Sequence, residues 1–149
     1  MLTQAEKGRA FRALHERDRA FIIPNPWDVG TARLLAHLGF EALATTSMGY
    51  AFSAGQRDNT IDRQRMMEHV SALASASDLP VSADLENGFG DAPETVAETI
   101  RLAAAAGVVG GSIEDASGGR SIPSMTARMR SRESGPRQRR CGPFPLLSP

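Results

Sequence analysis

Two hydrophobic periodicities alternate along the first 115 residues. Four short apolar runs predict buried strands at 20–24, 41–46, 80–84 and 108–113. Apolar residues at helical spacing predict helices over 3–17, 27–38, 62–76 and 91–107. Because strand and helix recur at intervals of roughly thirty residues, we expect a parallel sheet with right-handed crossovers.

Two architectures fit this pattern, an open doubly wound sheet and a (β/α)8 barrel. The first strand is followed by Pro24-Asn25-Pro26 and not by a glycine-rich phosphate-binding sequence. This disfavours a dinucleotide fold. We therefore expect an α/β fold over residues 1–120, made of about four βα units that form the N-terminal half of a TIM-type (β/α)8 barrel.

The C-terminal segment 121–149 has no apolar period and is rich in Arg, Ser, Gly and Pro. We expect it to be disordered. Residues 124–149 carry six arginines and one acid, so they are +5 and the rest of the neutral chain is −5. The abrupt change suggests a reading-frame shift after about Ser121, which the other two frames of the coding DNA would test.

Acidic residues follow three of the predicted strands. Strand alternation would put Asp84 and Glu86 on one side of the third strand. Asp58 lies in a predicted long loop, 47–60, and Glu114 follows the fourth strand. Because a barrel gathers functional residues at the carboxyl ends of its strands, we expect these acids to converge. A solvated acidic loop is the simpler alternative.

Such a cluster points to a metal. Carboxylates without a nearby histidine or cysteine are hard oxygen ligands, which favours Mg²⁺, or Mn²⁺, over zinc. Since magnesium keeps several waters, we expect Asp84 to bind it directly and the other acids to hold its waters. The site suits a substrate whose carbonyl and carboxylate chelate the metal, so that an enolate is stabilised as a bond to carbon breaks.

Composition argues against several other kinds of site. The only lysine, Lys7, lies in a predicted surface helix, which disfavours Schiff-base chemistry, and the only cysteine, Cys141, excludes an internal disulfide. His15, His37 and His69 fall on predicted helices and are expected to be surface or packing residues. No apolar run reaches membrane-spanning length and the N-terminus lacks a signal-peptide core, so we expect a cytoplasmic protein with no membrane partner.

Four separately placed motifs, in order, carry a family resemblance. The first, at 41–49, contains EAL and SMG, and the other three are GQRD at 55–58, SADLENGFG at 82–90 and SIED at 112–115. With them the chain resembles the isocitrate lyase / phosphoenolpyruvate mutase superfamily over about residues 8–120. The resemblance implies a modified (β/α)8 barrel that binds magnesium and makes or breaks C–C or P–C bonds of small 2-oxo acids through a pyruvate enolate.

The resemblance also implies roles for individual residues. It makes Asp84 the metal ligand, with Glu86, Glu114 and Asp58 completing the metal shell through water. Asp58 and Glu114 are also the implied catalytic residues. The family segment that binds the substrate carboxylate, through a hydroxyl and backbone N–H groups, falls on three residues: Thr46, Ser47 and Met48. Complete relatives are expected to be homo-oligomers.

Two departures from the family leave the substrate open. The Lys-Cys-Gly-His lid motif of the isocitrate-type lyases is missing, and residues 116–120 lack the lysine or asparagine that mutases carry at this point. A decarboxylase or lyase of a small oxo acid remains open. The chain is also about half the length that eight units need.

An inactive half-barrel that serves as an oligomer partner is one alternative function. A nucleic-acid-binding arm is another, since six arginines in a flexible segment attract phosphates without sequence readout. Only Phe144 is available there for base stacking, so nucleic acid is the less favoured partner.

Overall fold

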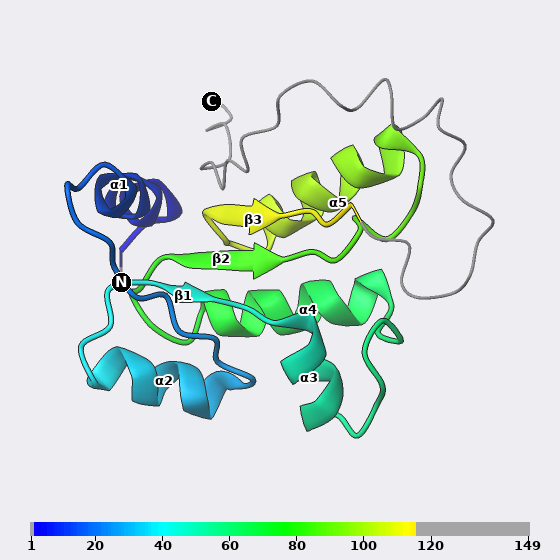
Figure 1. Cartoon of the computed structure of the whole chain (residues 1–149), viewed down its shortest axis with the longest axis horizontal. Helices are drawn as coiled ribbons and strands as arrows, with labels where there is room; N and C mark the ends of the chain where they lie inside the picture. Colours follow the sequence, from blue (N-terminus) through cyan, green and yellow to red (C-terminus); the bar gives the residue numbers. More distant parts are fainter. Residues whose placement is uncertain (1, 116–149) are drawn as a thin grey trace.

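The computed structural model describes residues 2–115, which form an α/β unit around a three-stranded parallel sheet (Figure 1). The strands are β1 (Leu43–Ala44), β2 (Val81–Asp84) and β3 (Gly110–Ser112). β2 is central, with Leu43 paired to Val81 on one side and Asp84 paired to Ser112 on the other. The predicted α/β class and parallel sheet are confirmed, and the half-barrel remains a prediction.

Five helices of the described part pack around this sheet: α1 (Gln4–His15), α2 (Val29–His37), α3 (Ser47–Ser53), α4 (Arg63–Ala74) and α5 (Pro93–Ala105). Side-chain caps fix four of their starts, because Thr3, Asp28, Thr46 and Asp62 each accept a backbone N–H of the first turn. α5 instead begins with Pro93, whose missing N–H costs nothing in a first turn.

The two faces of the sheet are covered by different helices. Val81 and Ala83 point into the main core, where they pack with buried residues of α4 and α5. The other face carries Ser82 and Gly110, and α1 covers it with the ring of Phe11. A methyl group on Gly110 would lie only 2.9 Å from that ring, so glycine lets α1 approach the sheet closely.

The predicted strand at 20–24 is wrong. The segment runs beside β1, where the N–H of Ala44 donates to the carbonyl of Pro24 at 3.1 Å, but no strand is assigned to it. Pro24 and Pro26 have no N–H to donate, so a regular ladder cannot continue through this segment. The apolar run reflects burial against α1 and not strand pairing, since Phe21 and Ile23 pack with Phe11 and Leu14 there.

The predicted loop 47–60 is also wrong in its first half, because residues 47–53 form α3. Gly49 favoured the loop interpretation, since glycine is a poor helix former. Glycine is needed at position 49 for a different reason, because a methyl group there would lie 2.5 Å from Nε1 of Trp27. The helix accepts glycine because the indole occupies the space that a side chain would need.

Lys7 is not the surface lysine that the sequence suggested. Its ammonium is buried at the end of α4 and donates to the carbonyls of Ala74 and Ser77, at 3.0 and 2.6 Å. Burial lowers the pKa of this amine below its ordinary value. The helix period placed the residue on α1 correctly but could not show that its amine satisfies the last carbonyls of another helix.

The predicted domain boundary near residue 120, the tail 121–149 and Cys141 lie outside the described residues. Within residues 2–115, no helix is both long and apolar enough to cross a membrane.

Candidate functional site

Asp84, the last residue of β2, is held from two neighbouring segments. Its Oδ2 accepts hydrogen bonds from the backbone N–H and the hydroxyl of Ser47, at 2.9 and 2.8 Å. Its Oδ1 accepts the N–H of Glu86 at 3.2 Å, and its own N–H donates to the hydroxyl of Thr45 at 2.9 Å. The turn between β1 and α3 therefore fixes the carboxylate.

Glu86 follows in an unusual backbone conformation. Its φ of 50° lies in the left-handed region, so strand alternation, which ends at Asp84, does not set the direction of its side chain. The carbonyl of Glu86 accepts the N–H of Glu114 at 2.6 Å, which joins the loops that follow β2 and β3. Glu86 is only 7% exposed, and its Oε1 is buried without a hydrogen-bond partner among the described residues.

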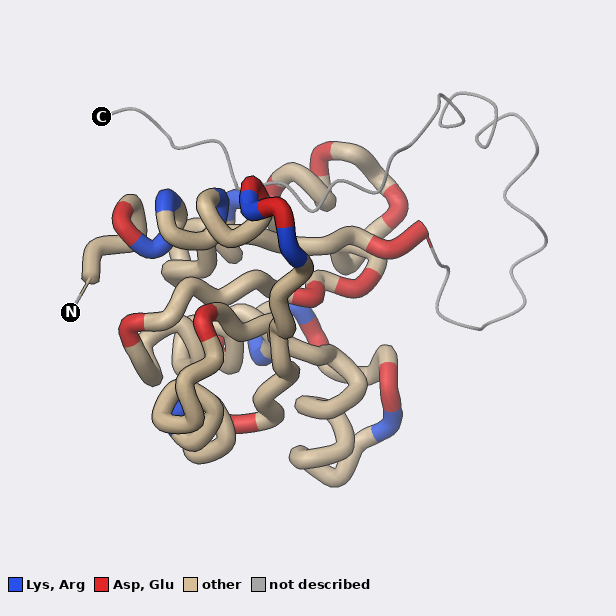
Figure 2. The backbone as a smooth tube through the Cα atoms, turned by 60° about the vertical axis from the view of Figure 1, so that its left-hand side comes forward, with Lys and Arg blue, Asp and Glu red and all other residues tan. Residues whose placement is uncertain are grey.

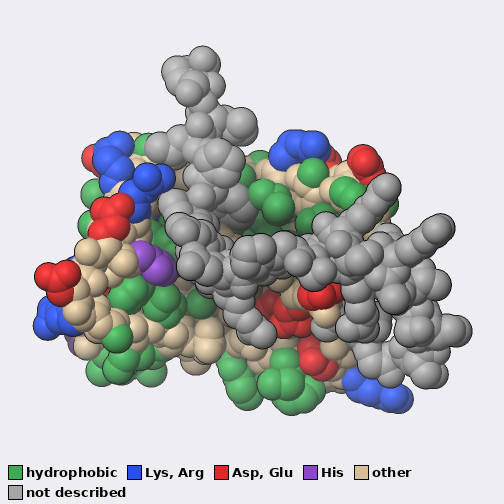
Figure 3. All heavy atoms as spheres, turned by 45° about the horizontal axis from the view of Figure 1, so that its top comes forward, with side chains coloured by type: hydrophobic (Ala, Val, Ile, Leu, Met, Phe, Trp, Pro, Cys, Tyr) green, Lys and Arg blue, Asp and Glu red, His purple; other side chains and the backbone are tan. Residues whose placement is uncertain are grey.

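The electrostatics of Glu86 show that the predicted acids act on one another. The pKa of Glu86 is raised from 4.5 to about 7, chiefly by burial and in addition by the negative charges of Asp84, Asp58 and Glu114. Acidic segments gather where the described chain ends after β3 (Figure 2), and acidic side chains lie together on one face (Figure 3). A cation bound here would relieve both the burial and the repulsion.

The other two predicted acids are Asp58 and Glu114. Asp58 is half-buried in the loop after α3, where its Oδ1 accepts the N–H of Asn59 at 3.0 Å, and Glu114 is exposed after β3. Among residues 2–115 no three His, Cys, Asp or Glu side chains are close enough to bind one metal ion directly. A magnesium ion that keeps most of its waters does not need three direct protein ligands.

The three predicted substrate-binding residues all lie at the start of α3. Thr46 caps the helix by accepting the N–H of Gly49 at 3.2 Å, and Met48 is 49% exposed. Both donors of Ser47 are engaged by Asp84. Sequence reasoning missed Thr45, whose hydroxyl accepts the N–H of Asp84, although the run of three hydroxyl residues at 45–47 was a signal that could have found it.

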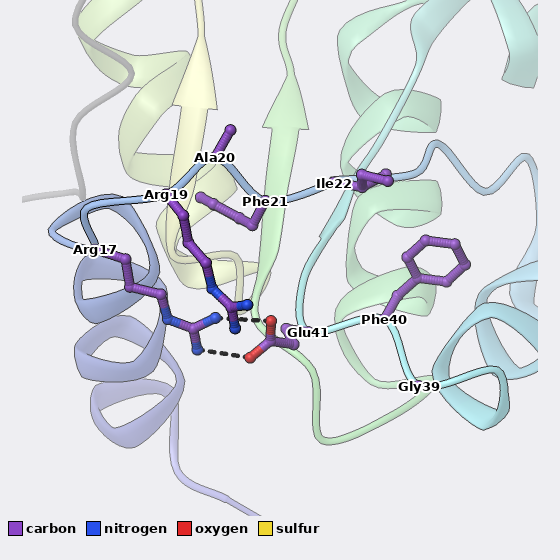
Figure 4. A pocket seen from close by; sticks show the side chains of 8 residues that line it. All are labelled: Arg17, Arg19, Ala20, Phe21, Ile22, Gly39, Phe40 and Glu41. Carbon is purple, nitrogen blue, oxygen red and sulfur yellow. Dashed lines mark hydrogen bonds and ion pairs between the residues drawn. The ribbon is translucent and has the colours of Figure 1, made fainter.

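A separate cavity of about 270 Å³ lies at the opposite edge of the sheet (Figure 4). Its residues come from the turn after α1, from the start of the segment beside β1, and from the turn before β1: Arg17, Arg19, Ala20, Phe21, Ile22, Gly39, Phe40 and Glu41. Arg17 donates to both carboxylate oxygens of Glu41, at 2.6 and 2.8 Å. This pair ties the turn after α1 to the start of β1 and lies away from the acidic strand ends.

The family model and the curated relatives point to the same family. The family model for phosphoenolpyruvate phosphomutase matches residues 11–144. The chain is 33% identical over 106 residues to 2,3-dimethylmalate lyase of Eubacterium barkeri, covering 70% of this chain and 36% of that enzyme. The family match continues past residue 120, where the sequence resemblance was expected to end.

Solved structures agree with the sequence matches. A candidate lyase/mutase of Burkholderia cenocepacia J2315 is 75% identical, with a TM-score of 0.76, over 77% of this chain and 42% of that one. A phosphonopyruvate hydrolase solved with oxalate and Mg²⁺ is 26% identical, with a TM-score of 0.72, over 80% of this chain and 41% of that one. The chain thus spans less than half the length of these relatives.

Proposed function

The chain belongs to the phosphoenolpyruvate phosphomutase family, within the isocitrate lyase / PEP mutase superfamily, and from this premise we propose that its acidic strand ends bind Mg²⁺ for chemistry on a small 2-oxo acid. Its relatives include lyases and mutases. The proposed reaction makes or breaks a C–C or P–C bond next to the oxo group, through a pyruvate enolate. Mn²⁺ is the alternative metal.

One observation carries this proposal: the buried Oε1 of Glu86, which has no hydrogen-bond partner within residues 2–115. A buried carboxylate without a donor is costly, and this one has three further acids acting on it. Removing that cost requires either a proton or a cation. The donor set consists of oxygen atoms, which suits magnesium and fits the ion present in the phosphonopyruvate hydrolase structure.

We assign the metal to Asp84, with Glu86, Glu114 and Asp58 holding its water molecules. When bound, the metal supplies positive charge that stabilises an enolate oxygen. The other tasks belong to the protein. Ser47 orients the carboxylate of Asp84 through two hydrogen bonds. When no cation is present, Glu86 keeps a proton on its carboxyl group up to about pH 7.

The substrate carboxylate is assigned to the start of α3, at Thr46, Ser47 and Met48. This segment begins beside Asp84, so a ligand bound there would lie next to the acidic strand ends. Two relatives were solved with oxalate, a small dicarboxylate that resembles the enolate of a 2-oxo acid in shape and charge. Asp58 and Glu114 are the proposed catalytic residues, as holders of water at the metal.

Because the chain spans less than half of its relatives, binding is the part of the function that it can be tested for first. Turnover needs the walls that the remaining units supply in a complete barrel. Assembly into an oligomer and catalysis by a longer form are parts of the same proposal.

Calorimetric titration with Mg²⁺, then with oxalate, tests the proposal. We expect Mg²⁺ to bind wild type and to be required for oxalate. Asp84→Asn keeps the size of the side chain but removes its charge, so Mg²⁺ binding should be lost. Asp18→Asn, at an exposed position after α1, is the matched control and should bind as wild type does. No Mg²⁺ binding by wild type, or equal binding by Asp84→Asn, would contradict the proposal.

A further inference from the structure

The placement of α3 decides where the carboxylate of Asp84 lies. Ser47 is the first residue of α3, and both of its donors bind Oδ2 of Asp84. A displacement of α3 therefore displaces the carboxylate or breaks its hydrogen bonds. Any residue that fixes α3 against the rest of the fold acts on the candidate site without touching it.

α3 is too short to hold its place alone. It has seven residues, and isolated helices of that length are not stable in water. Its position depends on tertiary contacts, which the structure shows on two sides. On one side Gly49 lies against the indole of Trp27. On the other the ring of Tyr50 stacks on His69 of α4, with centroids 3.7 Å apart and an interplanar angle of 8°.

His69 is a costly residue to bury for packing alone. It is 8% exposed, and its Nε2 has no hydrogen-bond partner among the described residues. An apolar side chain at this position would avoid that cost. What the imidazole supplies is a flat ring stacked on the ring of Tyr50, and aromatic pairs gain energy beyond their buried area.

We propose that His69 is a positioning residue: through its stack with Tyr50 it holds α3 so that Ser47 keeps the carboxylate of Asp84 in place for the metal. The inference rests on the proposed function for its last step only. The first step, from His69 to the Ser47–Asp84 hydrogen bonds, is a property of the fold and can be measured without metal.

The first test is hydrogen exchange of the Ser47 amide. As the first N–H of α3 it has no partner within the helix, so its protection reports the bond to Asp84. We expect His69→Ala to speed this exchange by up to about 10-fold relative to the Leu73 amide of α4, because the energy of an aromatic pair is lost from the local opening of α3. His69→Phe keeps a flat ring on Tyr50 and should restore protection. Leu14→Ala, which opens the separate cluster under α1, should leave the ratio unchanged.

The second test is the Mg²⁺ affinity of the same variants. His69→Ala should weaken binding about 10-fold, as removal of a residue that supports a metal ligand commonly does. His69→Phe should bind as wild type does. If wild type binds no Mg²⁺, the proposed function fails and the exchange data alone decide this inference. The inference is overturned if Ser47 exchange in His69→Ala matches that in Leu14→Ala, or if His69→Phe does not restore it.

Discussion

Ser47 donates both its backbone N–H and its hydroxyl to one oxygen of Asp84, Oδ2, at 2.9 and 2.8 Å. The two residues are 37 positions apart: Ser47 begins α3, which follows β1, and Asp84 ends the neighbouring strand β2. The contact joins the segment proposed to bind the substrate carboxylate to the proposed metal ligand. It leaves Oδ1 with one weaker partner, the N–H of Glu86 at 3.2 Å, and therefore as the oxygen most available to a cation.

The role of the Ser47 hydroxyl can be tested by removing it in Ser47→Ala. We expect Ser47→Ala to weaken Mg²⁺ binding about 10-fold, because the carboxylate loses one of the bonds that orient it. Ser53→Ala is the matched control: it removes a hydroxyl from the same helix, one that donates to the carbonyl of Tyr50 and not to Asp84. Equal affinities of the two variants, measured by calorimetry, would argue against an orienting role for Ser47.

Replacing Gly49 or Gly8 by alanine should change the stability of the fold in opposite directions. Gly49→Ala should lower the free energy of unfolding by about 1–3 kcal/mol, because the new methyl group would lie 2.5 Å from Nε1 of Trp27. Gly8→Ala in α1 should raise it by about 0.5–1 kcal/mol, because nothing lies closer than 3.9 Å and alanine favours helix. Urea unfolding measures both. A neutral Gly49→Ala would show that Trp27 does not constrain α3.

The raised pKa of Glu86 predicts how stability changes with pH. The folded state holds this proton up to about pH 7, whereas an unfolded glutamate releases it near 4.5. The folded state therefore binds more protons in this window, and the free energy of unfolding should fall as pH rises through it. Glu86→Gln should remove that fall when unfolding is followed in chelator. Parallel profiles for wild type and Glu86→Gln would mean that the carboxyl group titrates normally.

The lowered pKa of His69 predicts a pH dependence of stability with the opposite sign to that of Glu86, over nearly the same pH range. Burial lowers its pKa from 6.5 to about 4, and the charge of Asp28 opposes this only in part. The unfolded state binds more protons between these values, so the contribution of His69 to stability should be lost as pH falls from 6.5 toward 4. His69→Phe should abolish this loss. The two effects partly cancel in wild type, so only the single variants separate them.

The sequence predicted the elements whose patterns are local. The periods found α1, α2, α4 and α5. Asp62, the first residue of the predicted helix 62–76, caps α4 by accepting the N–H of Arg65 at 2.9 Å. Strands were found at 43–44, 81–84 and 110–112, each within a longer predicted run. These succeeded because caps and apolar spacing depend on residues close together in the chain.

Two of the errors involve partners far apart in the chain. Gly49 suggested a loop because the indole of Trp27, which takes the place of its side chain, comes from another segment. Lys7 looked exposed because the carbonyls of Ala74 and Ser77 are 67 and 70 residues away. The left-handed backbone of Glu86 has no signature in a non-glycine residue. The acidic residues were predicted to converge because the carboxyl ends of parallel strands lie at one end of a sheet, and the charges of three of them act on Glu86. Their role in binding a metal stays a prediction.

Paramagnetic broadening by Mn²⁺ tests the location of the metal site most directly. Substoichiometric Mn²⁺ added to ¹⁵N-labelled protein should broaden the amide signals of Ser47, Glu86 and Glu114 first, and excess Mg²⁺ should reverse the effect. Signals from the Arg17–Glu41 pair, at the opposite edge of the sheet, should broaden last. Broadening that begins elsewhere, or that spreads evenly over the molecule, would contradict a divalent metal site at the acidic strand ends.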